Sequence, residues 1–197
     1  MAHTLQVDLR GRLNPVRDQG PRRTCLAHSL SAAHEYARGF PGLLSPEYLH
    51  YFATSGNPSR GCAMKAGQVA LESSGQPEEK SCPYSTDLPA AGWKPQAGAL
   101  TFRRRSHSIT PRFADVKAAL LEQRLVVLGV RLPESFFQPV SPWVIEPEGR
   151  THGLHAIVAA GVGKHRATEV ILIRNSWGRH WADNGYALLT ARLILPT

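Results

Sequence analysis

The chain has 197 residues, 42% of them hydrophobic, so it can bury a core as one domain or as two lobes that share a cleft. No uninterrupted apolar run of about 18 residues occurs, which excludes a membrane-spanning helix. The net charge of +8 includes clusters at Arg22-Arg23 and Arg103-Arg104-Arg105, but no aromatic-rich basic face or nucleic-acid-binding motif accompanies them, so we expect neither a membrane nor a nucleic-acid partner.

The first part of the chain is expected to be mainly helical. Residues up to Gly20 have the composition of extended or turn structure, and apolar residues then recur at helical spacing. Helices are expected over 25–38, from Ser45 through Phe52, and over 64–73. Residues 76–99 are rich in Pro, Gly and Ser and are expected to form a long surface connection.

The later part of the chain changes to β-rich runs of branched and apolar residues. The expected strands cover 106–109, 125–130, 155–160, 170–174 and 185–189, with an amphipathic helix over 113–123. Helices followed by strands favour an α+β fold with two segregated layers. A site formed by residues from both parts would lie between those layers.

Cys25 is the candidate nucleophile. It opens the first expected helix, and Thr24 precedes it at the N-cap position. The positive end of a helix dipole lowers the pKa of a cysteine placed there, which favours the reactive thiolate. A thiolate nucleophile also needs a base beside it, and that base needs a residue that orients it.

His155 and Asn175 are the candidates for these two roles. His155 opens an apolar strand, and Asn175 follows another. An asparagine carbonyl can accept the imidazole N–H without adding a charge, and Trp177 could shield that hydrogen bond from water. The alternatives are a half-buried structural histidine and a structural Asn-Ser turn beside a core tryptophan. His28 is close to Cys25 in sequence, but it lies on the same expected helix.

Gln19 is the candidate donor for an oxyanion. Attack on an amide places negative charge on the carbonyl oxygen, which needs donors already in position. The side chain of Gln19 and the backbone N–H of Cys25 could supply two such donors. By itself, Gln19 would be read as an ordinary turn residue.

Four sequence blocks make the chain similar to the papain family of cysteine peptidases, which includes papain and the cathepsins. The blocks are Gln19-Gly20, Cys25-Leu26-Ala27-His28-Ser29, Leu154-His155-Ala156, and Asn175-Ser176-Trp177-Gly178 followed by Trp181 and Asn184-Gly185-Tyr186. The cysteine is also separated from the other two residues by the roughly 130–150 residues typical of that family. Weaker similarity occurs at Ser45-Pro46-Glu47-Tyr48-Leu49, Gly61-Cys62 and Cys82-Pro83-Tyr84.

The resemblance implies a papain-like α+β fold over residues 1–197 as a single catalytic domain. A helical left lobe would cover roughly residues 10–100, and an antiparallel, β-barrel-like right lobe would cover roughly residues 101–197. The active-site cleft would lie between the lobes. Catalysis would use Cys25, His155, Asn175 and Gln19, through a thiolate–imidazolium pair and an acyl-enzyme, with no cofactor and no metal.

Substrate contacts are expected from residues around this constellation: Arg23, Ala63, Met64, Leu154 and Trp177. Several of them depart from the family pattern. Arg23 replaces a glycine at the substrate-binding edge, and Ala63-Met64-Lys65 replaces a Gly-Gly pair that would bind the substrate backbone. Arg22 replaces the cysteine that would form a disulfide with the residue matching Cys62.

The sequence therefore predicts a thiol hydrolase that cleaves peptide bonds in a peptide or protein substrate. The alternatives are an effector- or toxin-type enzyme of the same fold, acting as a deamidase, isopeptidase or acyl transferase, and a catalytically silent module that binds peptides. A protein inhibitor or immunity partner is a further candidate, because no inhibitory propeptide is expected before the similarity begins near Asp8.

Cysteine content and the N-terminal sequence bear on localisation. Three cysteines, Cys25, Cys62 and Cys82, allow at most one disulfide if Cys25 stays a thiol. Such sparing use favours a reducing compartment, with Cys62 and Cys82 as buried thiols. The first residues lack the apolar segment of a signal peptide. We expect a cytoplasmic protein, or one exported by a signal-peptide-independent route.

Overall fold

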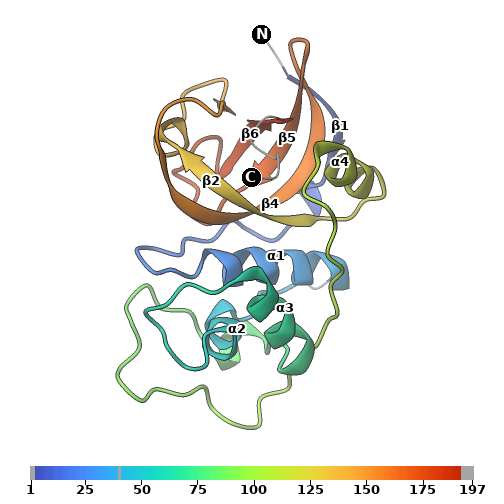
Figure 1. Ribbon diagram of the computed structural model, residues 1–197. Helices are drawn as coiled ribbons and strands as arrows, with labels where there is room; N and C mark the ends of the chain where they lie inside the picture. The colour runs from blue at the N-terminus through green and yellow to red at the C-terminus, as the bar shows by residue number, and fades with distance from the viewer. Residues whose placement is uncertain (1–2, 40, 192–197) are drawn as a thin grey trace. The chain divides into compact units, whose positions relative to one another are not determined.

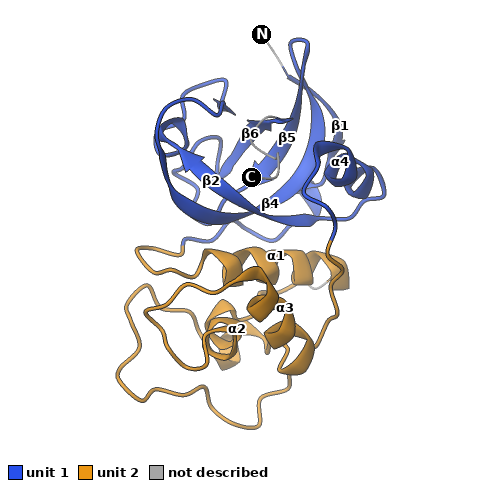
Figure 2. Cartoon of the chain, in the orientation of Figure 1, with its two compact units in different colours: residues 1–18, 109–197 blue, residues 19–108 orange. Residues whose placement is uncertain are grey.

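The computed structural model describes residues 3–39 and 41–191 and divides into two compact units (Figure 2). Unit 1 combines Met1–Asp18 with Ile109–Thr197, and unit 2 is Gln19–Ser108. Unit 2 contains three of the helices and unit 1 contains the sheet (Figure 1). Residues 10–18 thus group with the strands, whereas the sequence placed them in the helical lobe.

The helices of unit 2 are α1 (Cys25–Arg38), α2 (Pro46–Ala53) and α3 (Met64–Ser73), with a short 3-10 turn, η2 (Glu79–Ser81). Helix α1 ends at Gly39, whose left-handed φ of 62° suits glycine and lets its N–H bond to the last carbonyls of the helix. Helix α2 begins at Ser45, whose Oγ accepts the N–H of Tyr48 at 3.0 Å. Local sequence signals therefore set these helix ends.

Two sequence expectations in unit 2 need correction. The connection over residues 76–99 is not wholly on the surface, because Gln76 is fully buried and its side chain bonds to Ser31 and to the carbonyl of Ser45. Residues 106–109 form no strand; they are exposed and have no regular structure. Alternation of polar and apolar residues gave the strand signal there, but the segment does not join the sheet.

Unit 1 is built on a six-stranded, mostly antiparallel sheet with the order β1-β4-β5-β6-β3, and β2 also pairs with β4. The strands are β1 (His3–Asp8), β2 (Val126–Pro133), β3 (Val144–Ile145), β4 (Thr151–His165), β5 (Thr168–Arg174) and β6 (Tyr186–Thr190). The β3–β6 pair is parallel. Within the described residues the pairing does not close into a ring, so the sheet is open where the sequence predicted a barrel-like lobe.

Strand β4 is the centre of unit 1, because it pairs with β1, β2 and β5 (Figure 1). Residues 155–163 of this strand are all buried. A side chain at Gly161 would bring its Cβ within 2.5 Å of the carbonyl oxygen of Val7 in β1, so glycine permits the close strand contact. Strand β4 covers Thr151–His165 and so extends beyond the expected 155–160 at both ends.

Helix α4 (Phe113–Leu121) packs in unit 1, with Val116 and Leu120 fully buried. It ends two residues before the expected boundary. The 3-10 turns η1 (Arg10–Arg12) and η3 (Glu134–Phe136) are the other regular elements among the described residues of this unit. Among the described residues, no helix combines the length and the apolar character needed to span a membrane.

Candidate active site

His155 and Asn175 are brought together in unit 1. His155 lies on β4 opposite Val130 of β2 and is only 6% exposed. Its Nε2 lies 2.7 Å from Oδ1 of Asn175. Because a carbonyl oxygen can only accept, Nε2 must carry the hydrogen, and Nδ1 of the neutral ring is left as the basic nitrogen. The asparagine thus selects the imidazole tautomer.

Asn175 is itself held by several backbone contacts. It follows β5 directly, and its N–H donates to the carbonyl of Gly185 at 3.0 Å. Its Oδ1 accepts a second hydrogen bond from the N–H of Ser176 at 2.8 Å, which fixes the orientation of the amide. Gly185 has a φ of 89°, and a Cβ there would meet Val16, so the turn requires glycine.

Aromatic rings surround the His155–Asn175 pair. The ring of Trp177 lies 4.9 Å from that of His155, and Phe136, which is fully buried, contacts both rings at 5.7 and 5.3 Å. Trp181 packs on Phe136 at 4.9 Å and donates its Nε1–H to the Phe136 carbonyl. These rings exclude water from the hydrogen bond and therefore strengthen it.

Burial affects the protonation of His155. Desolvation lowers the pKa of its imidazole, and the hydrogen bond to Asn175 opposes that effect without cancelling it. The neutral ring is therefore the stable form of an isolated His155 near pH 7. A nearby negative charge would be needed to stabilise the imidazolium form.

Cys25 and Gln19 lie in unit 2. Cys25 is the first residue of α1 and is partly exposed. Gln19 is buried, and its Nε2 donates to the carbonyl of Arg22 at 2.6 Å. Gly20 follows with a φ of 58°, and a Cβ there would lie 2.9 Å from Thr86. The loop that precedes the candidate nucleophile is therefore packed against the body of unit 2.

The other two cysteines have little nucleophilic character. All three cysteines are present as thiols. Burial raises the pKa of Cys62 to about 11, and the charge of Cys25 contributes further. Burial also raises the pKa of Cys82. Because the thiolate is the reacting form, Cys62 and Cys82 stay protonated and unreactive near pH 7.

Known proteins resemble this chain both in sequence and in fold. The family model described as "Papain family cysteine protease" matches residues 4–193, which is almost the whole chain. The chain belongs to the papain family of cysteine proteases. The family match and the α+β architecture confirm the resemblance and the fold class drawn from the sequence.

Individual relatives of this papain-family chain are distant. Cathepsin K of Gallus gallus is 28% identical over 191 residues, which is 93% of this chain and 57% of that protein. The oryzain gamma chain of Oryza sativa subsp. japonica is 28% identical over 186 residues, 89% of this chain and 51% of that protein. The chain thus spans little more than half the length of these curated relatives.

The fold has close structural neighbours. Xylellain, a cysteine protease from Xylella fastidiosa, superimposes with a TM-score of 0.80 at 23% identity, covering all of this chain and 83% of that one. The digestive procathepsin L 3 of Tenebrio molitor larval midgut gives a TM-score of 0.79 at 19% identity, covering 96% of this chain and 65% of that one. These similarities show the fold of the papain family.

Arg22, which stands where the family has a disulfide cysteine, is buried in unit 2. Both terminal nitrogens of its guanidinium bond to the carboxylate of Glu47 on α2, at 2.5 and 2.8 Å, and Nη1 also donates to the carbonyl of Ser85. The two side chains are 2% and 4% exposed. Arg22 therefore fastens the loop before Cys25 to the rest of unit 2, as a covalent bridge would.

The expected substrate-binding residues fall in both units. Arg23, Ala63 and Met64 belong to unit 2; the first two are exposed, and Met64 opens α3. Leu154 of unit 1 is 77% exposed, and Trp177 is half-buried against His155. Their roles in substrate binding stay predictions.

Sequence reasoning missed three residues that support candidate site residues: Phe136 in unit 1, and Tyr84 and Glu47 in unit 2. Phe136 was hidden because no motif marks the Phe136-Phe137 pair. Tyr84 was noted only as part of a weak family block, although its hydroxyl bonds to the carbonyl of Gln19. Glu47 was read only as a helix-start residue. In the structure it is buried, and a buried carboxylate needs a cationic partner, which Arg22 supplies.

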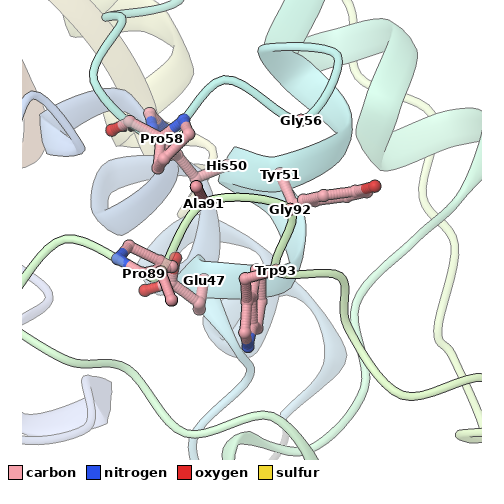
Figure 3. Close-up of a pocket in the computed structure, with 10 residues that line it drawn as sticks. Glu47, His50, Tyr51, Gly56, Pro58, Pro89, Ala91, Gly92 and Trp93 are labelled. Carbon is pink, nitrogen blue, oxygen red and sulfur yellow. Dashed lines mark hydrogen bonds between the residues drawn. The ribbon is translucent and has the colours of Figure 1, made fainter.

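A small pocket in unit 2 contains none of the expected site residues. It has a volume of about 50 Å³ and lies between α2 and residues 89–93, with His50, Tyr51 and Trp93 among its lining residues (Figure 3). Within residues 3–39 and 41–191, no group of three or more His, Cys, Asp and Glu side chains is placed to hold a metal ion.

Proposed function

We propose that this chain hydrolyses peptide bonds by thiol catalysis, with Cys25 as nucleophile and His155 as the base oriented by Asn175. The buried 2.7 Å hydrogen bond from His155 to Asn175 carries the proposal, because it leaves Nδ1 as the basic nitrogen. The position of Cys25 at the start of α1 and the family match support it further. The family match does not favour the effector-type enzymes or the silent module.

The reaction would proceed in two halves. The Cys25 thiolate attacks the carbonyl carbon, and the resulting oxyanion accepts hydrogen bonds from Gln19 and the N–H of Cys25. The imidazolium of His155 then protonates the departing amine as the thioester forms. In the second half, Nδ1 takes a proton from water, the hydroxide attacks the thioester, and the thiolate returns as the acid product leaves.

The imidazolium form of His155 needs a negative charge beside it. Burial disfavours the imidazolium form of His155, so the thiolate of Cys25 must supply the compensating negative charge. Formation of such a pair is coupled, because each charge stabilises the other. Loss of either residue should then change the titration of its partner.

The substrate is expected to be a peptide or protein segment. Leu154 offers an exposed apolar side chain near His155 in sequence, which favours an apolar residue in the substrate. Arg23 adds a positive charge close to Cys25 in sequence. A library of fluorogenic peptide amides with apolar, acidic and basic residues would define this preference.

We expect an epoxide or vinyl-sulfone thiol probe to modify Cys25 at neutral pH and to abolish hydrolysis of fluorogenic peptide amides. Mass spectrometry of the labelled chain should locate the probe on Cys25 and not on Cys62 or Cys82. The variant Cys25→Ser should lose both labelling and hydrolysis, while Cys62→Ser should keep both. A wild-type chain that is not modified at Cys25 would contradict the proposal.

A further inference from the structure

A single tyrosine hydroxyl ties together the two ends of the loop that precedes Cys25. Tyr84 donates its hydroxyl hydrogen to the carbonyl oxygen of Gln19 at 2.7 Å. The hydroxyl oxygen of Tyr84 also lies 2.8 Å from Oγ1 of Thr24. Gln19 and Thr24 are the first and last residues of that loop, and Thr24 is covalently joined to Cys25.

The direction of this hydrogen-bond chain follows from its members. A backbone carbonyl can only accept, so the one hydroxyl hydrogen of Tyr84 goes to Gln19. Thr24 must then donate its hydrogen to the Tyr84 oxygen. The order is Thr24 to Tyr84 to the Gln19 carbonyl, and hydrogen bonds linked in this way strengthen one another. The hydroxyl of Thr24 is thus engaged with Tyr84, which explains why its side chain does not cap α1.

The ring of Tyr84 is held independently of its hydroxyl. The ring of His28 on α1 meets it edge-on at 4.5 Å, and the guanidinium of Arg22 lies 5.0 Å from its centroid. Arg22 is fixed in turn by its buried pairing with Glu47. The ring therefore has little freedom, and the hydroxyl is presented to the loop from a fixed position.

We infer that Tyr84 is a positioning residue for the oxyanion-binding groups; this inference rests on the proposed function. Its hydroxyl sets the distance between Gln19, whose side chain is one proposed donor, and the start of α1, whose first N–H is the other. The amide of Gln19 also bonds to the carbonyl of Arg22, inside the same loop. Oxyanion donors act only when they are held within about 0.5 Å of the productive geometry.

The variant Tyr84→Phe tests this role, because it removes the hydroxyl and keeps the ring against His28 and Arg22. We expect kcat for a peptide amide to fall by about ten- to a thousandfold, up to the loss seen when an oxyanion donor is removed. KM should stay within about twofold, because the interaction is made mainly in the transition state. Thr24→Val should lower kcat in the same direction, and the double variant should be no worse than Tyr84→Phe alone.

A second reaction separates positioning from damage to the thiol or the fold. Iodoacetamide alkylates a thiolate by direct displacement and forms no oxyanion, so Tyr84→Phe should react at Cys25 at the wild-type rate within about twofold. Tyr51→Phe, the same change elsewhere in unit 2, should leave both reactions unaltered.

Three results would overturn the inference. They are a kcat within twofold of wild type, an equal loss of alkylation and hydrolysis in Tyr84→Phe, and a wild-type chain that is alkylated at Cys25 yet cleaves no peptide. The last result would reject the proposed function itself, and the first two would reject only the role of Tyr84.

Discussion

Replacing His155 by alanine is expected to lower kcat for peptide hydrolysis by about 10²–10⁴-fold, the contribution typical of a positioned acid–base group. The variant loses the basic nitrogen that Asn175 leaves available, together with the acid that protonates the departing amine. Steady-state kinetics on a fluorogenic peptide amide measure the effect.

The matched control for that variant is His152→Ala. His152 lies on the same strand, is exposed, and contacts Phe137 rather than Asn175. Its loss should change kcat by less than about twofold, in keeping with a surface substitution. Hydrolysis by His155→Ala within tenfold of the wild-type rate would show that another group serves as the base.

Deleting the carboxylate of Glu47 is expected to destabilise the fold by about 3–5 kcal/mol, the cost of leaving one buried charge without its partner. The guanidinium of Arg22 is 2% exposed and would keep its charge, because arginine does not deprotonate in proteins. Urea denaturation of Glu47→Ala, monitored by circular dichroism, gives the free energy of unfolding.

Two further variants separate the buried pair from charge effects in general. Arg22→Met combined with Glu47→Leu removes both charges and should recover stability to within about 1 kcal/mol of wild type, or exceed it. Glu72→Ala removes the exposed partner of Arg105 and should cost under about 1 kcal/mol. A loss below about 1 kcal/mol in Glu47→Ala would contradict the structural role given to the pair.

The placement of Arg22 also bears on the alternative of a silent binding module. Arg23 and the replacement of the family's Gly-Gly by Ala63-Met64-Lys65 were the grounds for that alternative, and Arg22 lying with Arg23 across the cleft would have favoured it. The guanidinium of Arg22 instead bonds inside unit 2, to the carboxylate of Glu47 and the carbonyl of Ser85. Only Arg23 is exposed. The departure from the family's disulfide is thus a change of stabilising interaction.

Local signals in the sequence predicted the helices of unit 2 well. Gly39 defines the end of α1, and Ser45-Pro46 defines the start of α2, because capping depends on neighbouring residues. Sheet boundaries were less accurate. The full length of β4 depends on three partner strands, and close pairing with β1 needs glycine at 161, which reads as a strand breaker in isolation.

In the candidate site, too, the sequence predicts the features that depend on neighbouring residues and misses those that depend on long-range contacts. The chemical types of His155 and Asn175, and the strand contexts that hold them, are visible in the sequence. The contacts that hold Gln19 and Thr24 depend on Tyr84, which is distant in sequence and carries no functional motif by itself. Long-range contacts of this kind follow from tertiary packing, so a single sequence gives no periodic or local signal for them.

The most direct measurement of the proposed chemistry is the pH dependence of Cys25 alkylation by iodoacetamide in the wild type and in His155→Ala. The pairing of Cys25 with His155 predicts that the wild-type rate reaches half its maximum below about pH 7.5, and that His155→Ala moves this midpoint upward. Cys62, with its pKa raised to about 11, should not interfere. A wild-type midpoint near the ordinary thiol value of about 8.5, unchanged in His155→Ala, would contradict the account.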